Sequence, residues 1–169
     1  MEMFLILGSG TGASYSDLKN FDVTALDPDE QMLSLNKFEK KVVGKGEELP
    51  FNENSFDNVL CCFVWRNVDD TQKTLSEVYR VLKPGGKFIL LDMTRPKNSF
   101  LKLIHKIGTF ILLHFVGLIT LNLKEYRFLY KSLDFYPQPE VNLTKNNYTN
   151  LVIERVGIFD FVYLGVFTK

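Results

Sequence analysis

Three glycines near the start of the chain are spaced as in a ligand-binding loop. Gly8, Gly10 and Gly12 lie in the sequence LILGSGTG, directly after a short apolar run. Glycine permits a tight turn and lets a ligand approach the backbone, and a following helix offers free N–H groups at its N-terminus. Asp27 stands where a carboxylate accepts hydrogen bonds from ribose hydroxyls. The combination predicts a site for an adenosine-containing cofactor.

Two cofactors fit this pattern, and the loop alone does not choose between them. Gly8, Gly10 and Ala13 satisfy the G-x-G-x-x-G/A spacing of dinucleotide-binding loops, which makes NAD one candidate. S-adenosylmethionine is the other: it has no pyrophosphate, and its amino-acid end lies along the glycine loop. A third interpretation is a turn and a capping aspartate without any ligand.

The elements that must position this loop alternate between apolar runs and amphipathic stretches. Strands are predicted at 3–7, 22–26, 41–43, 57–63, 87–91, 151–156 and 159–167, the last two as an antiparallel hairpin across Gly157. Helices are predicted at 13–19, 28–38 and 70–82, stopped by 83–86, with an apolar helical region at 99–130 and a break at Pro137 and Pro139. This alternation predicts an α/β fold with a mostly parallel sheet and helices on both faces. Ligands bind such sheets at the carboxyl ends of the strands, where the glycine loop lies.

Composition and charge narrow the class of protein. Twenty basic and twenty acidic residues cancel, which argues against a general nucleic-acid binder. A chain of 169 residues is predicted to form one domain. Cys61 and Cys62 are neighbours and would point to opposite faces of a strand, so we expect no disulfide between them. There is no zinc-like spacing and no signal peptide pattern, so we expect no metal site and a cytoplasmic location.

One segment, 107–121, has the sequence IGTFILLHFVGLITL and is apolar on every side of a helix. Its fifteen residues are fewer than the roughly 20 that span a bilayer. Lys102, His105, Lys106 and Lys124 flank it. We expect a buried or interfacial helix, covered by the core, a partner, a lipid surface or an apolar substrate. Peripheral membrane contact through 107–121 is thus one of four alternatives.

Several stretches, in order along nearly the whole chain, match one family. They are LILGSGTG (5–12), VTALDPDEQML (23–33), GKGEELPFNENSFDNV (44–59), WRNVDD (65–70), EVYRVLKPGGKFILLDMTRP (77–96) and, more weakly, EYRFLYKSLDFYP (125–137). In these stretches the chain resembles the class I S-adenosylmethionine-dependent methyltransferases, in particular the ubiquinone/menaquinone biosynthesis C-methyltransferase (UbiE-like) group. The resemblance implies S-adenosylmethionine as the cofactor. It also implies a Rossmann-like, doubly wound sheet of seven strands whose last strand is antiparallel, in a single domain 1–169 with an apolar helical insertion at 98–136.

The resemblance also assigns residues to the cofactor. It places Gly8, Ser9 and Gly10 at the methionine portion, Asp27 at the ribose, Pro28, Met32, Gly46 and Glu47 around the adenine, and Cys62 and Phe63 near the sulfonium. For each side chain, ordinary packing or a turn is the competing interpretation.

Methyl transfer chiefly requires that the acceptor be held in line with the methyl group. Methylation of a ring carbon also requires deprotonation of the ring hydroxyl by a base. The candidates for the base are His114, Tyr126 and Asp92, and the candidates for stabilising the phenolate are Arg66 and Arg127. The apolar segment after the fifth strand suits a lipophilic tail such as a prenyl chain. We therefore expect a small lipophilic acceptor, methylated on a ring carbon or a hydroxyl.

Three features depart from the family pattern. Ile6 stands where the family usually has an acid that orients the cofactor's ammonium group, and Lys45 stands where it has an aspartate that contacts the adenine amino group. Glu47 is a candidate substitute for that aspartate. The third departure is that the chain begins at the first strand, without the family's N-terminal lid helices. A homodimer, a partner chain or an upstream segment would then cover the site. The second hypothesis is a catalytically degenerate binding or interaction domain, and an NAD-dependent enzyme is the third.

Overall fold

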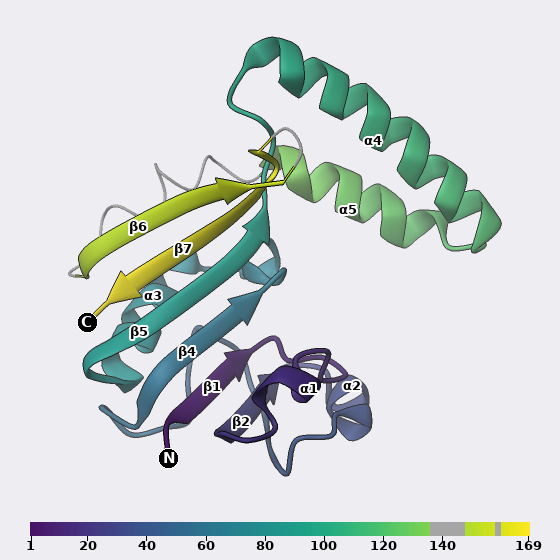
Figure 1. The fold of residues 1–169 in the computed structure, drawn as a ribbon. Coiled ribbons are helices and arrows are strands. Elements are labelled where there is room, and N and C mark those ends of the chain that lie inside the picture. The colour runs from purple at the N-terminus through teal and green to yellow at the C-terminus, as the bar shows by residue number, and fades with distance from the viewer. Residues whose placement is uncertain (136–147, 158–159) are drawn as a thin grey trace.

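A single sheet of seven strands organises the computed structural model, which describes residues 1–135, 148–157 and 160–169 (Figure 1). The strands are β1 (Met3–Leu7), β2 (Asp22–Asp27), β3 (Lys40–Val43), β4 (Phe56–Cys62), β5 (Leu82–Met93), β6 (Thr149–Val156) and β7 (Val162–Thr168). Their order in the sheet is β3-β2-β1-β4-β5-β7-β6. The predicted break at Pro137 and Pro139 and the predicted strand start at 159 lie outside the described residues.

The strand directions confirm the predicted fold class. β1 runs parallel to β2 and β4, and β4 runs parallel to β5. β7 is antiparallel to both β5 and β6, so it is the antiparallel strand of the sheet. β1 has β2 on one side and β4 on the other, so the strand order reverses at β1. Ligands bind sheets of this kind at the carboxyl ends of the strands beside such a reversal.

Helices cover both faces of the sheet, and each face has its own apolar core. Adjacent strand residues point to opposite faces, so Leu5 belongs to the larger cluster and Ile6 to the smaller one. The larger cluster lies under α3 (Thr71–Val81) and includes Trp65 of the short 3-10 helix η1 (Trp65–Asn67). The smaller cluster lies under α1 (Tyr15–Leu18) and α2 (Glu30–Leu35).

The helices near the sheet are shorter than predicted, and a capping side chain sets the start of α2. Helix 28–38 was expected, but α2 begins at Glu30, since the Asp29 carboxylate accepts the N–H groups of Gln31 and Met32. It ends before Asn36, whose backbone is extended. α1 covers only part of the predicted 13–19, and the side chain of Ser14 does not cap it. The stretch 83–86, predicted to separate a helix from a strand, lies inside β5, which begins directly after α3.

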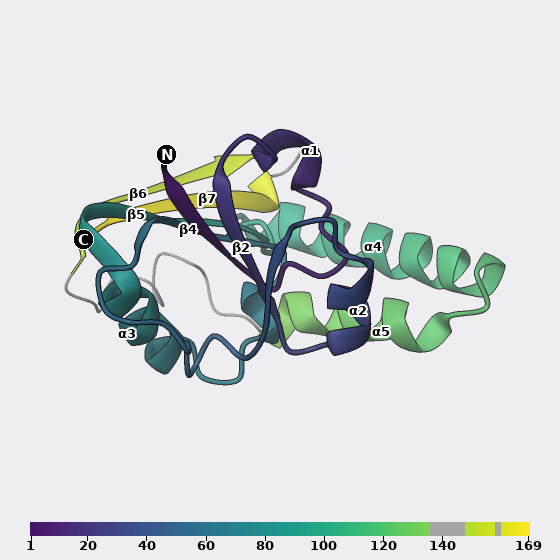
Figure 2. The ribbon, with the colours of Figure 1, turned by 90° about the horizontal axis from the view of Figure 1, so that it is seen from below.

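Two helices leave the sheet together and form what we call the arm: α4 (Ser99–Ile119) and α5 (Leu123–Phe135). They pack against each other and project beyond the edge of the sheet that holds the strand ends (Figures 1 and 2). Asn98 caps α4 by accepting the N–H groups of Phe100 and Leu101. α4 begins where the apolar helical region 99–130 was predicted to begin, and its 21 residues are long and apolar enough to cross a bilayer.

Arg95, just after β5, holds the arm at its base. Its side chain is 2% exposed. The guanidinium donates to the Asp134 carboxylate (3.1 Å), the Thr109 hydroxyl (2.7 Å) and the Tyr130 carbonyl (3.3 Å). It also lies 3.2 Å from Nδ1 of His105. Both helices of the arm are therefore fixed to the end of β5 by one buried cation.

Candidate functional site

A cavity of about 190 Å³ opens at the carboxyl ends of β1, β2 and β4. Its walls come from the ends of these strands and from the loops that follow them. The lining residues are Leu7, Gly8, Leu26, Pro28, 44–47, Cys61, Val64, 67–69 and Thr74. Four of the predicted cofactor-binding residues, Gly8, Pro28, Gly46 and Glu47, are thus brought to one cavity.

The glycine loop has a backbone that only glycine adopts easily. Gly8, Gly10 and Gly12 have φ angles of 64°, 50° and 84°, in the left-handed region that disfavours other residues. A Cβ at Gly8 would lie 2.4 Å from Val64, and one at Gly12 would lie 2.5 Å from the Asn36 amide oxygen. The first and third glycines are therefore required by close packing as well as by conformation.

Asp27, at the end of β2, ties the glycine loop to the sheet. One carboxylate oxygen accepts the N–H of Gly10 at 2.8 Å, and the other accepts the N–H of Asp29 at 2.9 Å. The residue is 8% exposed. Because a carboxylate oxygen has two lone pairs, each oxygen keeps capacity for a further donor, such as a ribose hydroxyl. Ribose binding by Asp27 stays a prediction that this geometry permits.

Asn36 is a residue that the sequence did not single out. It is buried, and its amide nitrogen donates to the Gly10 carbonyl at 3.0 Å and to the Ser9 hydroxyl at 3.3 Å. Met32 also meets the loop: its sulfur lies 3.6 Å from where a Cβ of Gly10 would be. Ser9, Gly10, Asp27 and Met32 therefore belong to one hydrogen-bonded and packed unit beside the cavity, although they do not line it.

The loop after β3 forms the opposite wall. Lys45 pairs with Asp69 at 3.2 Å, and Glu47 accepts the N–H groups of Asp69 and Asp70. The Thr74 hydroxyl is buried and has no hydrogen-bond partner among the described residues. An unpartnered polar group in a cavity wall fits a polar ligand, because burying such a group without a partner is unfavourable.

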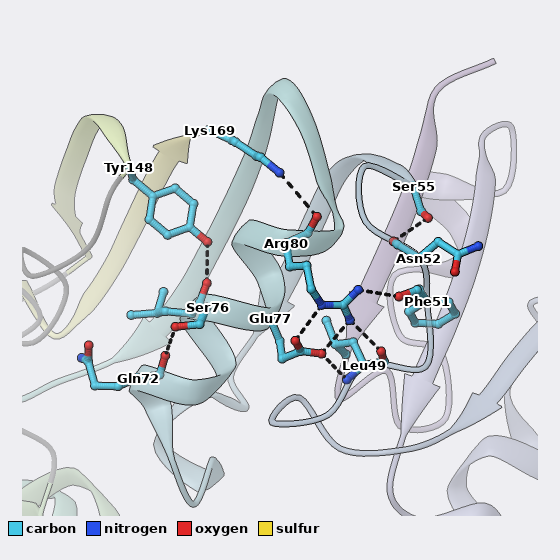
Figure 3. A network of polar contacts seen from close by, with 11 residues as sticks. Leu49, Phe51, Asn52, Ser55, Gln72, Ser76, Glu77, Arg80, Tyr148 and Lys169 are labelled. Atoms are coloured by element: carbon cyan, nitrogen blue, oxygen red, sulfur yellow. Dashed lines mark hydrogen bonds and ion pairs between the residues drawn. The ribbon is translucent and has the colours of Figure 1, made fainter.

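An ion pair on α3 anchors this loop (Figure 3). The Arg80 guanidinium donates to Glu77 at 2.7 Å and to the carbonyls of Leu49 and Phe51 at 2.9 and 2.7 Å. Glu77 in turn accepts the N–H of Leu49 at 2.8 Å. The hydrogen bond from Arg80 lowers the pKa of Glu77, so the carboxylate stays charged at neutral pH. The wall that includes 44–47 is therefore held firmly against α3.

The roles of Cys62 and Phe63 near the sulfonium stay predictions. Cys61 lines the cavity, whereas the predicted Cys62 and Phe63 do not. Burial raises the pKa of the Cys61 thiol, which therefore stays protonated. Phe63 has a φ of 59° and donates its N–H to the Leu91 carbonyl at 2.7 Å. A left-handed non-glycine residue stores strain, which is common beside functional sites.

Asp92 and Arg66, two of the catalytic candidates, form a buried ion pair. The Asp92 carboxylate accepts the backbone N–H of Arg66 at 3.1 Å and a second bond from its guanidinium. Burial raises the pKa of Asp92, and the charge of Arg66 opposes this shift. The pair fastens η1 to β5, and neither residue lines the cavity. Catalytic roles for both stay predictions.

The other three catalytic candidates lie on the arm. His114 has Nδ1 2.8 Å from the Phe110 carbonyl of its own helix. Tyr126 packs against Gly117, and Arg127 is exposed. None of them lines the cavity. The cavity therefore brings together Gly8, Pro28, Gly46 and Glu47, but not His114, Tyr126 or Arg127, and the catalytic roles of the latter three stay predictions.

The two sequence departures have different surroundings. Ile6 is buried in the smaller apolar cluster with Val23, Ala25 and Leu33. These neighbours suit an isoleucine, because an unpaired carboxylate among them would be strongly unfavourable. Lys45, by contrast, lies at the rim of the cavity with a mostly exposed side chain.

Comparison with known proteins agrees with this geometry. The chain is 38% identical over 151 residues to the ubiquinone/menaquinone biosynthesis C-methyltransferase UbiE of Rickettsia bellii, covering 78% of this chain and 61% of that protein. It is 39% identical to the same enzyme of Rickettsia felis over 132 residues, or 72% and 53% of the two chains. This chain therefore spans only part of the length of these relatives.

Solved structures show the same fold. An S-adenosylmethionine-dependent methyltransferase from Thermotoga maritima superposes with a TM-score of 0.71 at 22% identity, covering 100% of this chain and 83% of that one. A second, from Methanococcus maripaludis, gives a TM-score of 0.61 at 20% identity, covering 99% and 77%.

The family model described as "ubiE/COQ5 methyltransferase family" matches residues 7–145. S-adenosylmethionine, predicted from the sequence in preference to NAD, is the cofactor that this methyltransferase family implies. The fold, the cavity at the strand reversal and the match over most of the sequence agree: the chain belongs to the ubiE/COQ5 methyltransferase family.

Proposed function

We propose that this chain binds S-adenosylmethionine and transfers its methyl group to a small lipophilic acceptor, a quinone-precursor-like ring carbon or hydroxyl. The observation that chiefly supports the proposal is the cavity at the strand reversal, where the glycine loop is tied to the end of β2 by Asp27. The UbiE relatives methylate at carbon by name, which favours a ring carbon as the acceptor atom.

The cavity suits the adenosine part of the cofactor. Its volume of about 190 Å³ is below the roughly 300–1,000 Å³ of pockets that enclose a whole ligand. The base would lie between Pro28 and the 44–47 loop, with the ribose at Asp27. The backbone of Gly8 and Gly10 would hold the methionine portion, at the open side of the cavity.

Bound S-adenosylmethionine supplies an electrophilic methyl group on its sulfonium. The chain's own contribution is positioning, which can account for several kcal/mol of a barrier. The Asp92–Arg66 pair holds η1 against β5, and that places Asn67 and Val68 in the cavity wall. A proton leaving the acceptor's hydroxyl needs a base in reach, for which His114, Tyr126 and Asp92 remain the candidates.

The arm supports a lipophilic acceptor and contact with a lipid surface. Large apolar side chains are exposed along α4: Phe100, Leu103, Ile104, Ile107, Phe110, Ile111, Leu112, Phe115, Leu118 and Ile119. Exposed apolar surface on this scale marks interaction sites. Lys102, Lys124, Arg127 and Lys131 are exposed on the same two helices. Apolar side chains beside basic ones fit the boundary of an anionic bilayer.

Calorimetric titration with S-adenosylmethionine, S-adenosylhomocysteine and NAD tests the cofactor. We expect dissociation constants near micromolar for the first two, about −8 kcal/mol, and no binding of NAD. Asp27→Ala should abolish binding. Asp22→Ala removes an acid from the other end of the same strand and should leave binding unchanged. Failure of both sulfur compounds to bind at millimolar concentration would refute the proposal.

Flotation with vesicles tests the lipid surface. We expect the protein to bind vesicles that contain anionic phosphatidylglycerol more strongly than vesicles of phosphatidylcholine alone. Polar substitution of Phe110 and Phe115 should weaken vesicle and lipophilic-substrate binding while cofactor affinity is retained. Leu35→Ser, at an exposed leucine outside the arm, is the matched control. Equal vesicle binding by the arm variant and the control would show that the arm does not contact the lipid surface.

The second candidate function is a degenerate domain that binds partners and no longer catalyses. Ile6 and Lys45 favour it, because both replace acids of the family pattern. It predicts that no cofactor binds and that the arm contacts another protein. The same titration therefore separates the two functions.

A further inference from the structure

The rim of the cavity holds a lysine–aspartate pair whose chemistry matches one edge of a purine. Nζ of Lys45 lies 3.2 Å from Oδ2 of Asp69, and both residues line the cavity. The pair joins two segments that are far apart in sequence, the loop after β3 and the segment after β4.

The ion pair between Lys45 and Asp69 contributes little to the stability of the fold. The side chains of Lys45 and Asp69 are 64% and 80% exposed, and exposed ion pairs contribute about 0–1 kcal/mol. Oδ1 of Asp69 makes no hydrogen bond with the described residues. The pair is thus available to a ligand at the cavity mouth.

Glu47, the candidate substitute for the missing aspartate, binds backbone N–H groups of the protein. Its Oε1 accepts the N–H of Asp69 at 2.9 Å and that of Asp70 at 3.2 Å. It therefore fixes the backbone that presents the Asp69 side chain. The loop that presents Lys45 is fixed in turn by Arg80 through Leu49 and Phe51 (Figure 3). Both members of the pair stand on anchored backbone.

We infer that Asp69, with Lys45 beside it, recognises the adenine base of the cofactor and sets its specificity. This inference rests on the proposed function. Adenine presents an amino donor next to a ring-nitrogen acceptor, and a side chain with an adjacent acceptor and donor matches that edge. Asp69 supplies the acceptor for the 6-amino group, and Lys45 supplies the donor for the ring nitrogen. The ring nitrogen is N1, because a 6-oxo purine presents the opposite pattern there: a carbonyl acceptor next to an N1–H donor.

The test compares S-adenosylhomocysteine with its 6-oxo analogue, S-inosylhomocysteine, by calorimetric titration. The wild-type chain should prefer the adenine compound. Asp69→Ala should weaken binding of S-adenosylhomocysteine by about tenfold, the effect of losing one hydrogen bond to a charged group, and leave the affinity for the analogue unchanged. Glu48→Ala, an exposed carboxylate on the same loop, should change neither affinity.

A double variant separates recognition from folding. In Lys45→Asp combined with Asp69→Lys, the acceptor and the donor change places, so the preference should shift from the adenine compound towards its 6-oxo analogue. An unchanged preference in Asp69→Ala would overturn the inference while leaving the proposed function intact. If the wild-type chain bound neither compound, both the inference and the proposed function would be rejected. Thermal melts of each variant should match the wild type, since both positions are exposed.

Discussion

The cavity half of the molecule and the arm use the same apolar residue types in opposite ways. Around β1, β4 and β5, side chains such as Leu5, Val59 and Leu90 are fully buried. Along α4, leucines, isoleucines and phenylalanines lie in the open, and the buried residues of that helix are His105 and Gly117. Apolar content in the first region stabilises the fold. In the second it adds little to folding, and this contrast is the reason why we propose that the arm contacts a lipid surface.

The substitution with the largest expected effect on stability removes the contact that joins the arm to the sheet. Arg95→Ala removes the buried cation that bonds to both helices of the arm, and each hydrogen bond to a charged group that is lost costs about 1.5–3 kcal/mol. Hydrogen exchange should show amides of the arm losing protection while those of β1 and β4 keep it. Lys106→Ala removes another cation that pairs with Asp134 from a more exposed position and should have a much smaller effect. Equal loss of protection in the sheet would mean that the arm is part of the same cooperative unit.

A matched pair of leucines measures the contrast directly. Leu90→Ala, at a site that is 0% exposed, should lower the free energy of unfolding by about 2–5 kcal/mol through the cavity that it leaves. Leu112→Ala, at a site that is 58% exposed, should change it by no more than about 0.5 kcal/mol. Urea denaturation gives both values. Similar losses at the two sites would show that α4 is covered in solution.

The stability of the arm should depend on pH and should decrease as the pH falls. This effect should be smaller than those of the two substitutions above. Burial, together with the charge of Arg95, lowers the pKa of His105 below its usual 6.5. The unfolded arm then binds a proton more readily than the folded one, so stability falls as the pH drops below about 6.5. Hydrogen exchange of the arm at pH 7.5 and 5.5 should reveal this. His105→Gln should remove that contribution and His114→Gln should retain it.

The smallest effect belongs to the cavity rim. Lys45→Ala should change the free energy of unfolding by less than about 1 kcal/mol, because its pair with Asp69 is exposed. Chemical denaturation measures this change, and a loss of several kcal/mol would give the pair a structural role instead of one in recognition.

The sequence predicted the parts of the fold that depend on local pattern. The strand at 3–7 has the predicted bounds, since an apolar run ended by Gly8 needs no tertiary information. Helix ends were less accurate, because Asp29 and Asn36 act through side-chain hydrogen bonds that propensity does not reveal. The region 99–130 was expected to be helical, and it contains α4 and most of α5.

The candidate site was predicted only where a motif identifies it. Gly8, Pro28, Gly46 and Glu47 stood in recognisable stretches and line the cavity. Thr74, which also lines it, lies in an ordinary amphipathic helix, and its role arises from the fold. The sequence could not predict that α4 is exposed, because an apolar pattern on every side of a helix is the same for a buried helix and an exposed one.

The bond from Gly10 to Asp27 has a kinetic consequence. The glycine loop is already closed in the free chain, with its amide held at 2.8 Å by a carboxylate and its carbonyl by Asn36. The conformational entropy of ordering it is therefore lost during folding and not on ligand capture. Association should follow a single fast phase that is first order in ligand, without a slower step of loop closure.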